Sequence, residues 1–325
     1  MSNGHIESIA VVAGRHLRDR QWLQQDPAAR ALIATLDAAA DGAAVMVQPH
    51  PYFADETEYR AALVQAGADA LQAAGRRPAE IGMLVGCALG AEVSTPDPLY
   101  GAHAALGLDE SAAVMITRGE LTNLLDALAI ATSNGPAFDP RPRLVVVGCR
   151  MSQWSLRFAH PLALLVGDAV TAMVVGPGPG LRLLGMQTQV LGAKGGAMRL
   201  GPHVRADDGG FGEEIVLDAA AGRILAEIGP TAPVEVVRRL LARFGVAQQD
   251  VSLAPTQSIV GLAERWRAAL GIPEMFESIA TLGNAGPASV GANLREAWRR
   301  GQRDRIVAVQ LGWGLHFTAA LFDRR

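Results

Sequence analysis

Short apolar runs alternate along the chain with longer segments whose apolar residues recur at helical spacing. The runs predict buried strands at residues 6–13, 81–86, 144–148, 172–175 and 306–309. The longer segments predict helices at 55–75, 214–227, 234–243, 258–270 and 287–299. Strands that alternate with helices in this way are typical of an α/β protein. The pattern therefore predicts the fold class α/β.

The helix predicted at 55–75 carries signals for both of its ends. Asp55 is followed three residues later by Glu58, a pairing that caps helix starts, and the apolar stripe ends near Gly75. Further along, residues 177–180 read Pro-Gly-Pro-Gly, which predicts a hairpin turn.

The chain contains an internal repeat. In each half a helix-ending glycine, a strand, a Leu-Gly pair and a helix-opening residue follow in this order. The first set is Gly75, Ile81, Leu106 and Glu120, and the second set is Gly245, Val251, Leu270 and Asn284. The glycine precedes the strand by six residues and the leucine precedes the helix opening by fourteen in both sets. We therefore expect a duplicated α/β unit in which Glu120 and Asn284 open equivalent helices whose N-termini meet at the centre.

Length and composition agree with two such units. The 325 residues divide into predicted halves at 1–164 and 165–325, and an apolar fraction of 50% with 19% charged residues excludes a disordered chain. The net charge of −3, without a basic cluster, argues against nucleic-acid binding. No apolar run reaches the ~18 residues of a membrane span, and the N-terminus lacks a secretion signal. We therefore expect a cytoplasmic protein.

Cysteine and histidine give no sign of a metal site or a disulfide framework. The two cysteines, Cys87 and Cys149, each lie inside an apolar run, and the seven histidines are scattered without ligand spacing. We therefore predict no metal, no cofactor and structural roles for both cysteines. His316 lies two residues after Gly314, which leaves an approach to the candidate site open, but a core or outward side chain is favoured. Asp168 is expected to stabilise the backbone after Gly167.

Three short motifs stand out in the second half. Residues 165–172 read Leu-Val-Gly-Asp-Ala-Val-Thr-Ala, 283–289 read Gly-Asn-Ala-Gly-Pro-Ala-Ser, and 311–315 read Leu-Gly-Trp-Gly-Leu. They resemble, in order and spacing, the Gly-Asp-Gly-Ala-Gly-Ala, Gly-Asn-Thr-Ser-Ala-Ala-Ser and Phe-Gly-Gly-Gly-Phe motifs of thiolase-fold condensing enzymes of the β-ketoacyl-ACP synthase III branch. The resemblance covers nearly the whole chain. It implies a dimeric thiolase fold with five layers, α/β/α/β/α, and chemistry on acyl thioesters.

The residues that carry catalysis in this family are only partly present. The resemblance implies a Cys nucleophile at the start of a central helix, a His that follows Pro, and the Asn of Gly-Asn. Here Glu120 occupies the Cys position, Thr256 occupies the His position, and Asn284 matches the Asn. The resemblance also implies that neither Cys87 nor Cys149 reaches the reaction centre. An ordinary cysteine-dependent condensation is therefore not expected.

The residues that are present can still polarise a thioester. Acyl transfer to Glu120 would form a mixed anhydride, which is too reactive to be held for a slow second substrate. Thr256 can donate a hydrogen bond but has no pKa suited to proton transfer near neutral pH. The Asn284 amide and the backbone N–H groups near Glu120 and Gly314 can polarise a carbonyl group. The candidate site therefore consists of Glu120, Thr256, Asn284 and Gly314.

Three roles for Glu120 stay open. It can act as a general base whose pKa is raised by burial in a tunnel, although a helix N-terminus opposes that rise. It can cap its helix or pair with Arg118 in a silent site. It can also imitate an acylated nucleophile, as a glutamine does in related homologues.

Two function classes follow from these roles. In the first, the protein is an acyltransferase of secondary metabolism, such as polyketide synthesis, with acyl-CoA or an acyl carrier protein as substrate. Residues 22–54 correspond to the family's region over the pantetheine entrance but match it poorly, so both donors stay open. In the second class, the protein is a catalytically silent subunit of a heterodimeric ketosynthase. We expect a two-fold homodimer or heterodimer with an interface near residues 115–118.

Overall fold

One ten-stranded sheet forms the framework of the protein, and it consists of two five-stranded halves, the first and the second sheet. The computed structural model describes residues 4–25, 30–31, 33–34, 49–92, 95–118, 121–133, 139–152, 164–193, 198–204, 211–217, 221–257 and 260–324. The first sheet has the order β1 (His5–Ala13), β7 (Ala169–Gly176), β6 (Arg143–Cys149), β4 (Met83–Leu89) and β5 (Ala113–Ile116). The second has the order β8 (Leu181–Val190), β14 (His316–Asp323), β13 (Arg305–Gly312), β11 (Val251–Pro255) and β12 (Glu274–Met275). Two residue pairs between β1 and β8 join the sheets.

The two sheets repeat one topology, which confirms the predicted duplication. Strand β4 pairs in parallel with β5 and β6, and β6 pairs antiparallel with β7. In the same way, β11 pairs in parallel with β12 and β13, and β13 pairs antiparallel with β14. A 3₁₀ turn precedes the first strand of each set, at Pro78–Glu80 and Gln248–Asp250. Gly107 and Gly271 end the next helix of each set in the same left-handed conformation, with φ of 68°.

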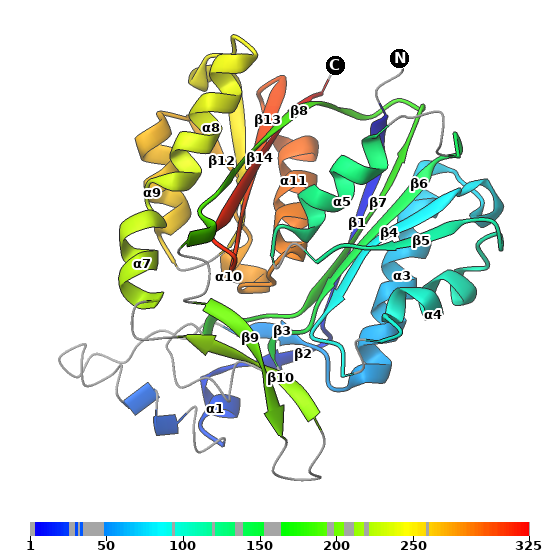
Figure 1. Cartoon of the computed structure of the whole chain (residues 1–325), viewed down its shortest axis with the longest axis horizontal. Helices are drawn as coiled ribbons and strands as arrows, with labels where there is room; N and C mark the ends of the chain where they lie inside the picture. The colour runs from blue at the N-terminus through cyan, green and yellow to red at the C-terminus, as the bar shows by residue number, and fades with distance from the viewer. Residues whose placement is uncertain are drawn as a thin grey trace.

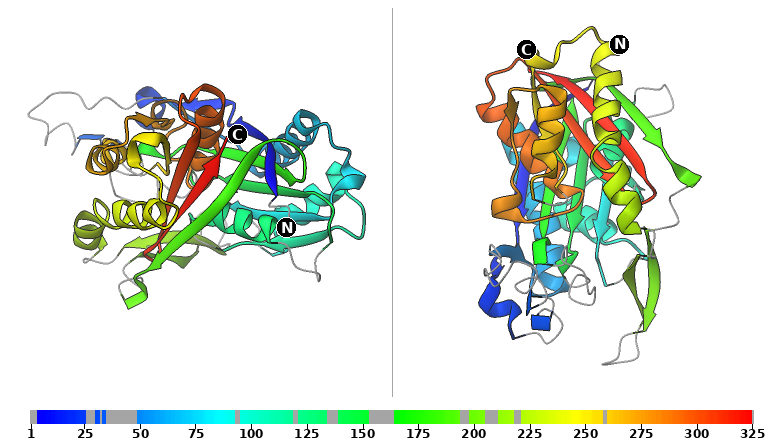
Figure 2. Two further views of the ribbon diagram at one scale, coloured as in Figure 1. Left: turned by 90° about the horizontal axis from the view of Figure 1, so that it is seen from above. Right: turned by 90° about the vertical axis from the view of Figure 1, so that its left-hand side faces the viewer.

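Helices cover both sheets and fill the space between them (Figures 1 and 2). Helices α3 (Glu56–Ala74) and α4 (Pro98–Leu106) cover the outer face of the first sheet, whereas α8 (Ala232–Arg243) and α9 (Leu262–Leu270) cover that of the second. Helices α5 (Asn123–Thr132) and α11 (Ala288–Arg300) lie between the sheets. The buried apolar residues form three clusters, one for each helical layer. The predicted five-layered arrangement, α/β/α/β/α, is therefore confirmed.

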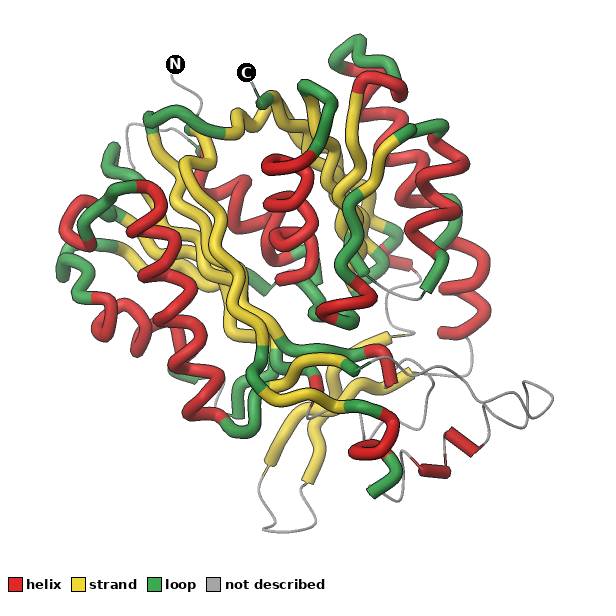
Figure 3. The backbone as a smooth tube through the Cα atoms, turned by 180° about the vertical axis from the view of Figure 1, so that it is seen from behind, coloured by secondary structure: helices red, strands yellow, loops and turns green. Residues whose placement is uncertain are grey.

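Smaller elements extend from one end of the layered body (Figure 3). They include two antiparallel ribbons, β2 (His16–Arg18) with β3 (His50–Tyr52) and β9 (Met198–Val204) with β10 (Phe211–Leu217). Three short helices complete the described elements: α1 (Arg20–Leu23), α7 (Ala221–Ile228) and α10 (Ile279–Leu282). Among the helices that the structure describes, none combines the length and apolar character that a bilayer crossing requires.

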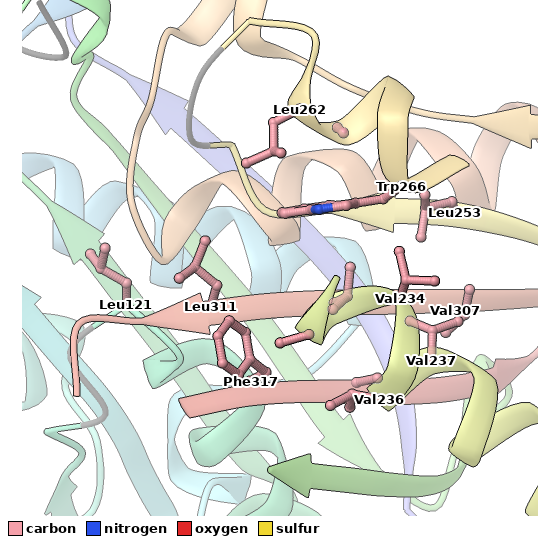
Figure 4. Packing of buried hydrophobic residues seen from close by; sticks show 14 of the residues in the cluster. Leu121, Val234, Val236, Val237, Leu253, Leu262, Trp266, Val307, Leu311 and Phe317 are labelled. Atoms are coloured by element: carbon pink, nitrogen blue, oxygen red, sulfur yellow. The ribbon is translucent and has the colours of Figure 1, made fainter. Parts of the chain in front are cut away.

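The cluster on the outer face of the second sheet shows how the core is built (Figure 4). Trp266 of α9 is almost fully buried, and its indole N–H donates to the Gly229 carbonyl at 2.8 Å, so its polar atom is satisfied. Val237 of α8 and Val307 of β13 belong to the same cluster. Leu121 and Leu311 lie together at one end of it. The turn before α5 is thereby packed onto the core of the second half.

The two central helices do not start at the residues that the repeat marked. Helix α11 starts at Ala288, which confirms the helix predicted at 287–299 but lies after Asn284, and α5 starts at Asn123, with Thr122 as its N-cap residue. Asn284 therefore does not open a helix, and Glu120 lies outside the described residues. Asn284 instead forms an isolated parallel bridge with Val166. This bridge extends the chain where helical dihedrals were expected.

Two other local predictions were wrong. The first part of the helix predicted at 214–227 is strand β10, because the β-branched pair Ile215 and Val216 favours extended backbone that pairs with β9. Residues 177–180 connect β7 to β8, which flank β1 and do not pair with each other, so the turn is not a hairpin. The chain passes from the first sheet to the second at this connection. The division into two domains stays a prediction.

The buried side chain of Gln310 joins the two central helices. Gln310 lies in β13 and has no solvent exposure. Its Oε1 accepts a hydrogen bond from the Leu125 N–H in the first turn of α5 at 3.0 Å. Its Nε2 donates to the carbonyl of Pro287, the N-cap residue of α11, at 3.1 Å. The two helix N-termini therefore meet at the centre, as predicted, through one carboxamide group.

Asp168 holds the β3 segment against the first sheet. Its Oδ2 accepts from the Phe53 N–H at 3.0 Å and the Ser152 hydroxyl at 2.5 Å, and its Oδ1 accepts from the Ser152 N–H at 2.9 Å. These bonds confirm the predicted backbone-stabilising role. Burial raises the pKa of Asp168 to about 6, although the three hydrogen bonds and Arg18 act in the opposite direction.

We expect Gln310→Leu to lower the free energy of unfolding by about 2–4 kcal/mol. The change leaves the Leu125 N–H and the Pro287 carbonyl buried without their partner, and each such group costs about 1–3 kcal/mol. Urea unfolding followed by circular dichroism measures the difference. The matched control is Gln302→Leu, because Gln302 is exposed. Equal unfolding free energies for the two variants would contradict the bridging role.

We also expect stability to fall as the pH rises from about 4 to 6, because of Asp168. Its folded pKa of about 6 exceeds its ordinary value of 3.8, so in this range the folded state holds a proton that the unfolded state releases. Asp168→Asn removes this titration. The variant should be less stable, and its free energy of unfolding should lack the wild-type decline of about 2–3 kcal/mol across this range. Parallel slopes for both proteins in denaturant titrations would contradict the assignment.

Candidate active site

Four turns gather where parallel strands end and the central helices begin (Figure 1). They are the segment between β5 and α5, the residues after β11, the loop before α11 and the turn between β13 and β14. Thr256, Asn284 and Gly314 lie on three of these turns. Glu120 lies between β5 and α5 in the sequence but outside the described residues.

Asn123 fixes the turn that leads into α5. The Leu121 N–H donates to Asn123 Oδ1 at 2.8 Å, and Asn123 Nδ2 donates to the Thr117 carbonyl at 3.0 Å. Leu121 has a φ of 88°, a conformation that costs a non-glycine residue about 1–3 kcal/mol. Strain of this size is retained only where the surrounding structure imposes it, and it is commonly found at functional turns.

The loop of Asn284 packs directly against this strained turn. The Asn284 N–H donates to the Leu165 carbonyl, and Asn284 Oδ1 accepts from the Gly286 N–H at 3.0 Å, which fixes the plane of the side-chain amide. Gly286 has a φ of 51°, and a Cβ placed there would lie 3.2 Å from Leu121 Cδ2 and 2.8 Å from Cys149 Sγ. Only glycine therefore fits this close approach. The structure brings Asn284 beside the residue that follows Glu120.

Thr256 is buried next to the same loop. Its N–H donates to the Val309 carbonyl of β13 at 2.7 Å. The neighbouring Gln257 N–H donates to Ser289 Oγ at 3.3 Å, and that hydroxyl donates to the Gly286 carbonyl at 2.6 Å. Ser289 thus links the turn of Thr256 to the turn of Asn284.

The glycine-rich turn around Gly314 supports a histidine ring. A Cβ placed on Gly312 would lie 2.2 Å from the His316 ring, and one placed on Gly314 would lie 3.4 Å from His316 Nδ1. Leu315 has a φ of 51° and its N–H donates to the Gly312 carbonyl at 3.0 Å, which closes the turn. The imidazole therefore lies on the turn instead of pointing away from it.

His316 continues into a hydrogen-bonded chain that sequence reasoning missed. His316 Nε2 lies 2.5 Å from Thr122 Oγ1, and the same hydroxyl lies 2.7 Å from Asp126 Oδ2. Thr122 is fully buried. The sequence favoured a core or outward position for His316 and left an approach to the site open, and the structure places its ring against the buried Thr122. Thr122 and Asp126 gave no signal because a threonine and an aspartate four residues apart are ordinary on a helix.

Both cysteines are unsuited to nucleophilic chemistry. Cys149 is fully buried and Cys87 is 5% exposed. Burial raises the pKa of both thiols well above the ordinary value. A thiol held in its neutral form is a weak nucleophile, because the thiolate is the reactive species. Although Cys149 lies next to Gly286, the predicted structural role fits its surroundings.

His50 is a second histidine that the sequence did not single out. It is buried against Gly283, because a Cβ on that glycine would lie 2.8 Å from the ring. Burial and the Arg18 guanidinium both lower the pKa of His50, so its ring is neutral near pH 7. It packs behind the Asn284 loop. Within the described ranges, no three His, Cys, Asp or Glu side chains come together as metal ligands.

Comparison with solved structures identifies the fold. A priming β-ketosynthase of a polyketide biosynthetic pathway matches with a TM-score of 0.81 and 21% identity, covering 99% of this chain and 97% of that chain. A 3-oxoacyl-(acyl carrier protein) synthase III of Xanthomonas oryzae pv. oryzae matches with a TM-score of 0.81 and 20% identity, covering 99% and 98%. An OleA variant of Xanthomonas campestris with bound lauric acid and lauroyl-CoA matches with a TM-score of 0.79 and 19% identity, covering 99% of both chains.

These matches show a similarity of fold alone, because the sequence identities are only 19–21%. No protein-family model matches the sequence, and no curated protein matches it. The resemblance read from the sequence motifs agrees with the structural matches over nearly the whole chain. The protein therefore has the thiolase fold of the β-ketoacyl synthase III-like enzymes.

Proposed function

We propose that the protein binds an acyl thioester and transfers or releases its acyl group without a cysteine acyl-enzyme. The acyl donor is acyl-CoA or an acyl carrier protein, and the setting is secondary metabolism such as polyketide synthesis. The observation that carries the proposal is that both thiols are buried, whereas the turns that carry Thr256, Asn284 and Gly314 are present. A covalent thioester intermediate requires a thiolate, and the surroundings of Cys87 and Cys149 favour the neutral thiol.

The turns of Thr256, Asn284 and Gly314 can bind and polarise a thioester carbonyl. Asn284 has its amide plane fixed by Gly286, and in this proposal backbone N–H groups of the Gly314 turn act together with it. Thr256 supplies a hydroxyl donor from a buried position. In this proposal Glu120 acts as a general base toward the attacking nucleophile. Donors that are already oriented stabilise developing negative charge without reorganisation.

A catalytically silent subunit of a heterodimeric ketosynthase is the second candidate. It is favoured by the replacement of both the Cys and the His of the family pattern, by Glu120 and Thr256. It is also favoured by β5, an edge strand of the sheet whose apolar residues Val114, Met115 and Ile116 are only half buried. Exposed edges of this kind are available for pairing with another chain.

Substitution of Glu120 separates the two candidates. Glu120→Gln keeps the volume and hydrogen-bonding reach but removes the basic oxygen, so consumption of lauroyl-CoA should fall by about 10²–10⁴-fold. Glu110→Gln, at an exposed position, is the control and should retain the wild-type rate. Equal rates for wild type and Glu120→Gln would eliminate the general-base role. Absence of turnover in the wild type, with activity appearing only when a ketosynthase homologue is added, would support the silent subunit.

Intact-protein mass spectrometry tests the absence of a covalent intermediate. After incubation with lauroyl-CoA we expect the unmodified mass, because the described residues present no thiolate. An acyl adduct that peptide mapping assigns to Cys149 or Cys87 would overturn the proposal.

We further propose a two-fold dimer through β5. Pairing of this edge would cover the half-buried residues Val114, Met115 and Ile116. Met115→Lys places a charge in the contact and should shift the mass measured by light scattering at micromolar concentration from dimer to monomer. A wild-type monomer without any added partner would contradict the homodimer and favour the heterodimer.

A further inference from the structure

We propose that Asp126, Thr122 and His316 form a proton relay that supplies the site with the acid–base group absent at Thr256. The inference rests on the proposed acyl transfer but assigns the base differently: His316 takes the proton of the nucleophile in place of Glu120, and the rates of His316→Gln and Glu120→Gln distinguish the two assignments. The three residues come from the central helix α5 and from β14, which are far apart in the sequence. Their shared hydroxyl keeps the imidazole and the carboxylate within about 5 Å of each other.

The hydroxyl of Thr122 does not cap α5, although Thr122 is the N-cap residue of that helix. Threonine at an N-cap normally accepts a hydrogen bond from a backbone N–H of the first turn. Thr122 is the N-cap residue of α5 but makes no such bond. The Leu125 N–H of this turn donates instead to Gln310 Oε1. The Thr122 hydroxyl is thus directed to the two side chains, which a purely structural cap would not require.

Counting protons shows which atom of His316 is the base. Two hydrogen bonds meet at Thr122 Oγ1, but the hydroxyl carries one proton, so a second proton must come from a partner. With Asp126 ionised, Thr122 donates to Asp126 Oδ2, and His316 Nε2–H must donate to Thr122. The imidazole then has its lone pair on Nδ1. This nitrogen lies against the glycine turn, 2.8 Å from where a Cβ of Gly312 would lie and 3.4 Å from where a Cβ of Gly314 would lie.

The surroundings of the chain suit proton transfer. Thr122 is fully buried, and His316 is partly exposed. Burial raises the pKa of Asp126, although the Thr122 hydroxyl and His316 oppose this, so the carboxyl group can take up a proton when His316 gains one. On the other sides of His316, β13 presents Gly312 and β8 presents Val190 in register. Asp126 is therefore the charged group that the described residues place beside the ring.

The relay balances as follows. His316 Nδ1 takes a proton from the attacking nucleophile, whose lone pair forms the bond to the thioester carbonyl carbon. The Nε2 proton then moves to Thr122 Oγ1, and the Thr122 proton moves to Asp126. The reverse sequence returns a proton from His316 Nδ1 to the leaving thiolate when the carbon–sulfur bond breaks. No oxidant, reductant or further reactant is needed.

Nuclear magnetic resonance of the histidine ring nitrogens tests the coupling without any assay of activity. We expect the neutral His316 ring of the wild type to carry its proton on Nε2, and we expect Thr122→Val and Asp126→Asn each to move part of that proton to Nδ1, because the acceptor chain at Nε2 is lost or reversed. His316→Gln identifies the signals. Thr318→Val is the matched control, since Thr318 is a buried threonine of the same strand that pairs with Thr188, and it should leave the tautomer unchanged. An unchanged tautomer in both Thr122→Val and Asp126→Asn would overturn the relay, and Asp126→Asn decides if Thr122→Val does not fold.

Turnover of lauroyl-CoA tests the acid–base role. His316→Gln should reduce the rate by about 10²–10⁴-fold. Thr318→Val should leave the rate unchanged. Full activity of His316→Gln would overturn the acid–base role while leaving the proposed acyl transfer intact. If the wild type consumes no acyl thioester, the proposed function fails, and the ring-nitrogen measurement still decides whether the three residues are coupled.

Discussion

The carboxamide of Gln310 is the constraint on which the centre of the molecule depends. Because a helix layer lies between the two sheets, the N-termini of α5 and α11 are buried at the centre, against the fully buried Gln310. Each N-terminus leaves backbone N–H groups to be satisfied. Gln310 bonds to the start of both helices at once, since its oxygen accepts from α5 and its nitrogen donates to the residue before α11. An apolar residue there would leave buried polar groups without partners, which is far more costly than a missing contact.

This arrangement has a consequence for chemistry. Because Gln310 satisfies the Leu125 N–H, the hydroxyl of Thr122 points to His316 and Asp126 instead of capping α5. The turn before α5 contains the left-handed Leu121, and Thr122 bonds to His316. This geometry supports the proposed acid–base chemistry, whereas the buried thiols do not support thiolate chemistry.

The buried Cys149 thiol and the strained turns lie in the same region of the molecule. Leu121 and Leu315 both have left-handed backbone, and they lie on the turns that lead to Thr122 and His316. Cys149 lies just behind, against Gly286, but in apolar surroundings that keep it neutral. The two sheets are connected by only two residue pairs, so the middle layer carries most of the contact between halves. The site lies where this layer ends.

The sequence by itself determined the α/β class, the duplication and, to within a few residues, most of the strands and helices that were predicted from it, because apolar periodicity, caps such as Asp55 and glycine landmarks act over a few residues. It also marked the turns of Thr256, Asn284 and Gly314 as one candidate site. Tertiary structure alone decided that Gln310 caps α5 and that His316 meets a threonine almost two hundred positions away. Such partners are set by how two sheets stack, and nothing in local spacing encodes the distance between them.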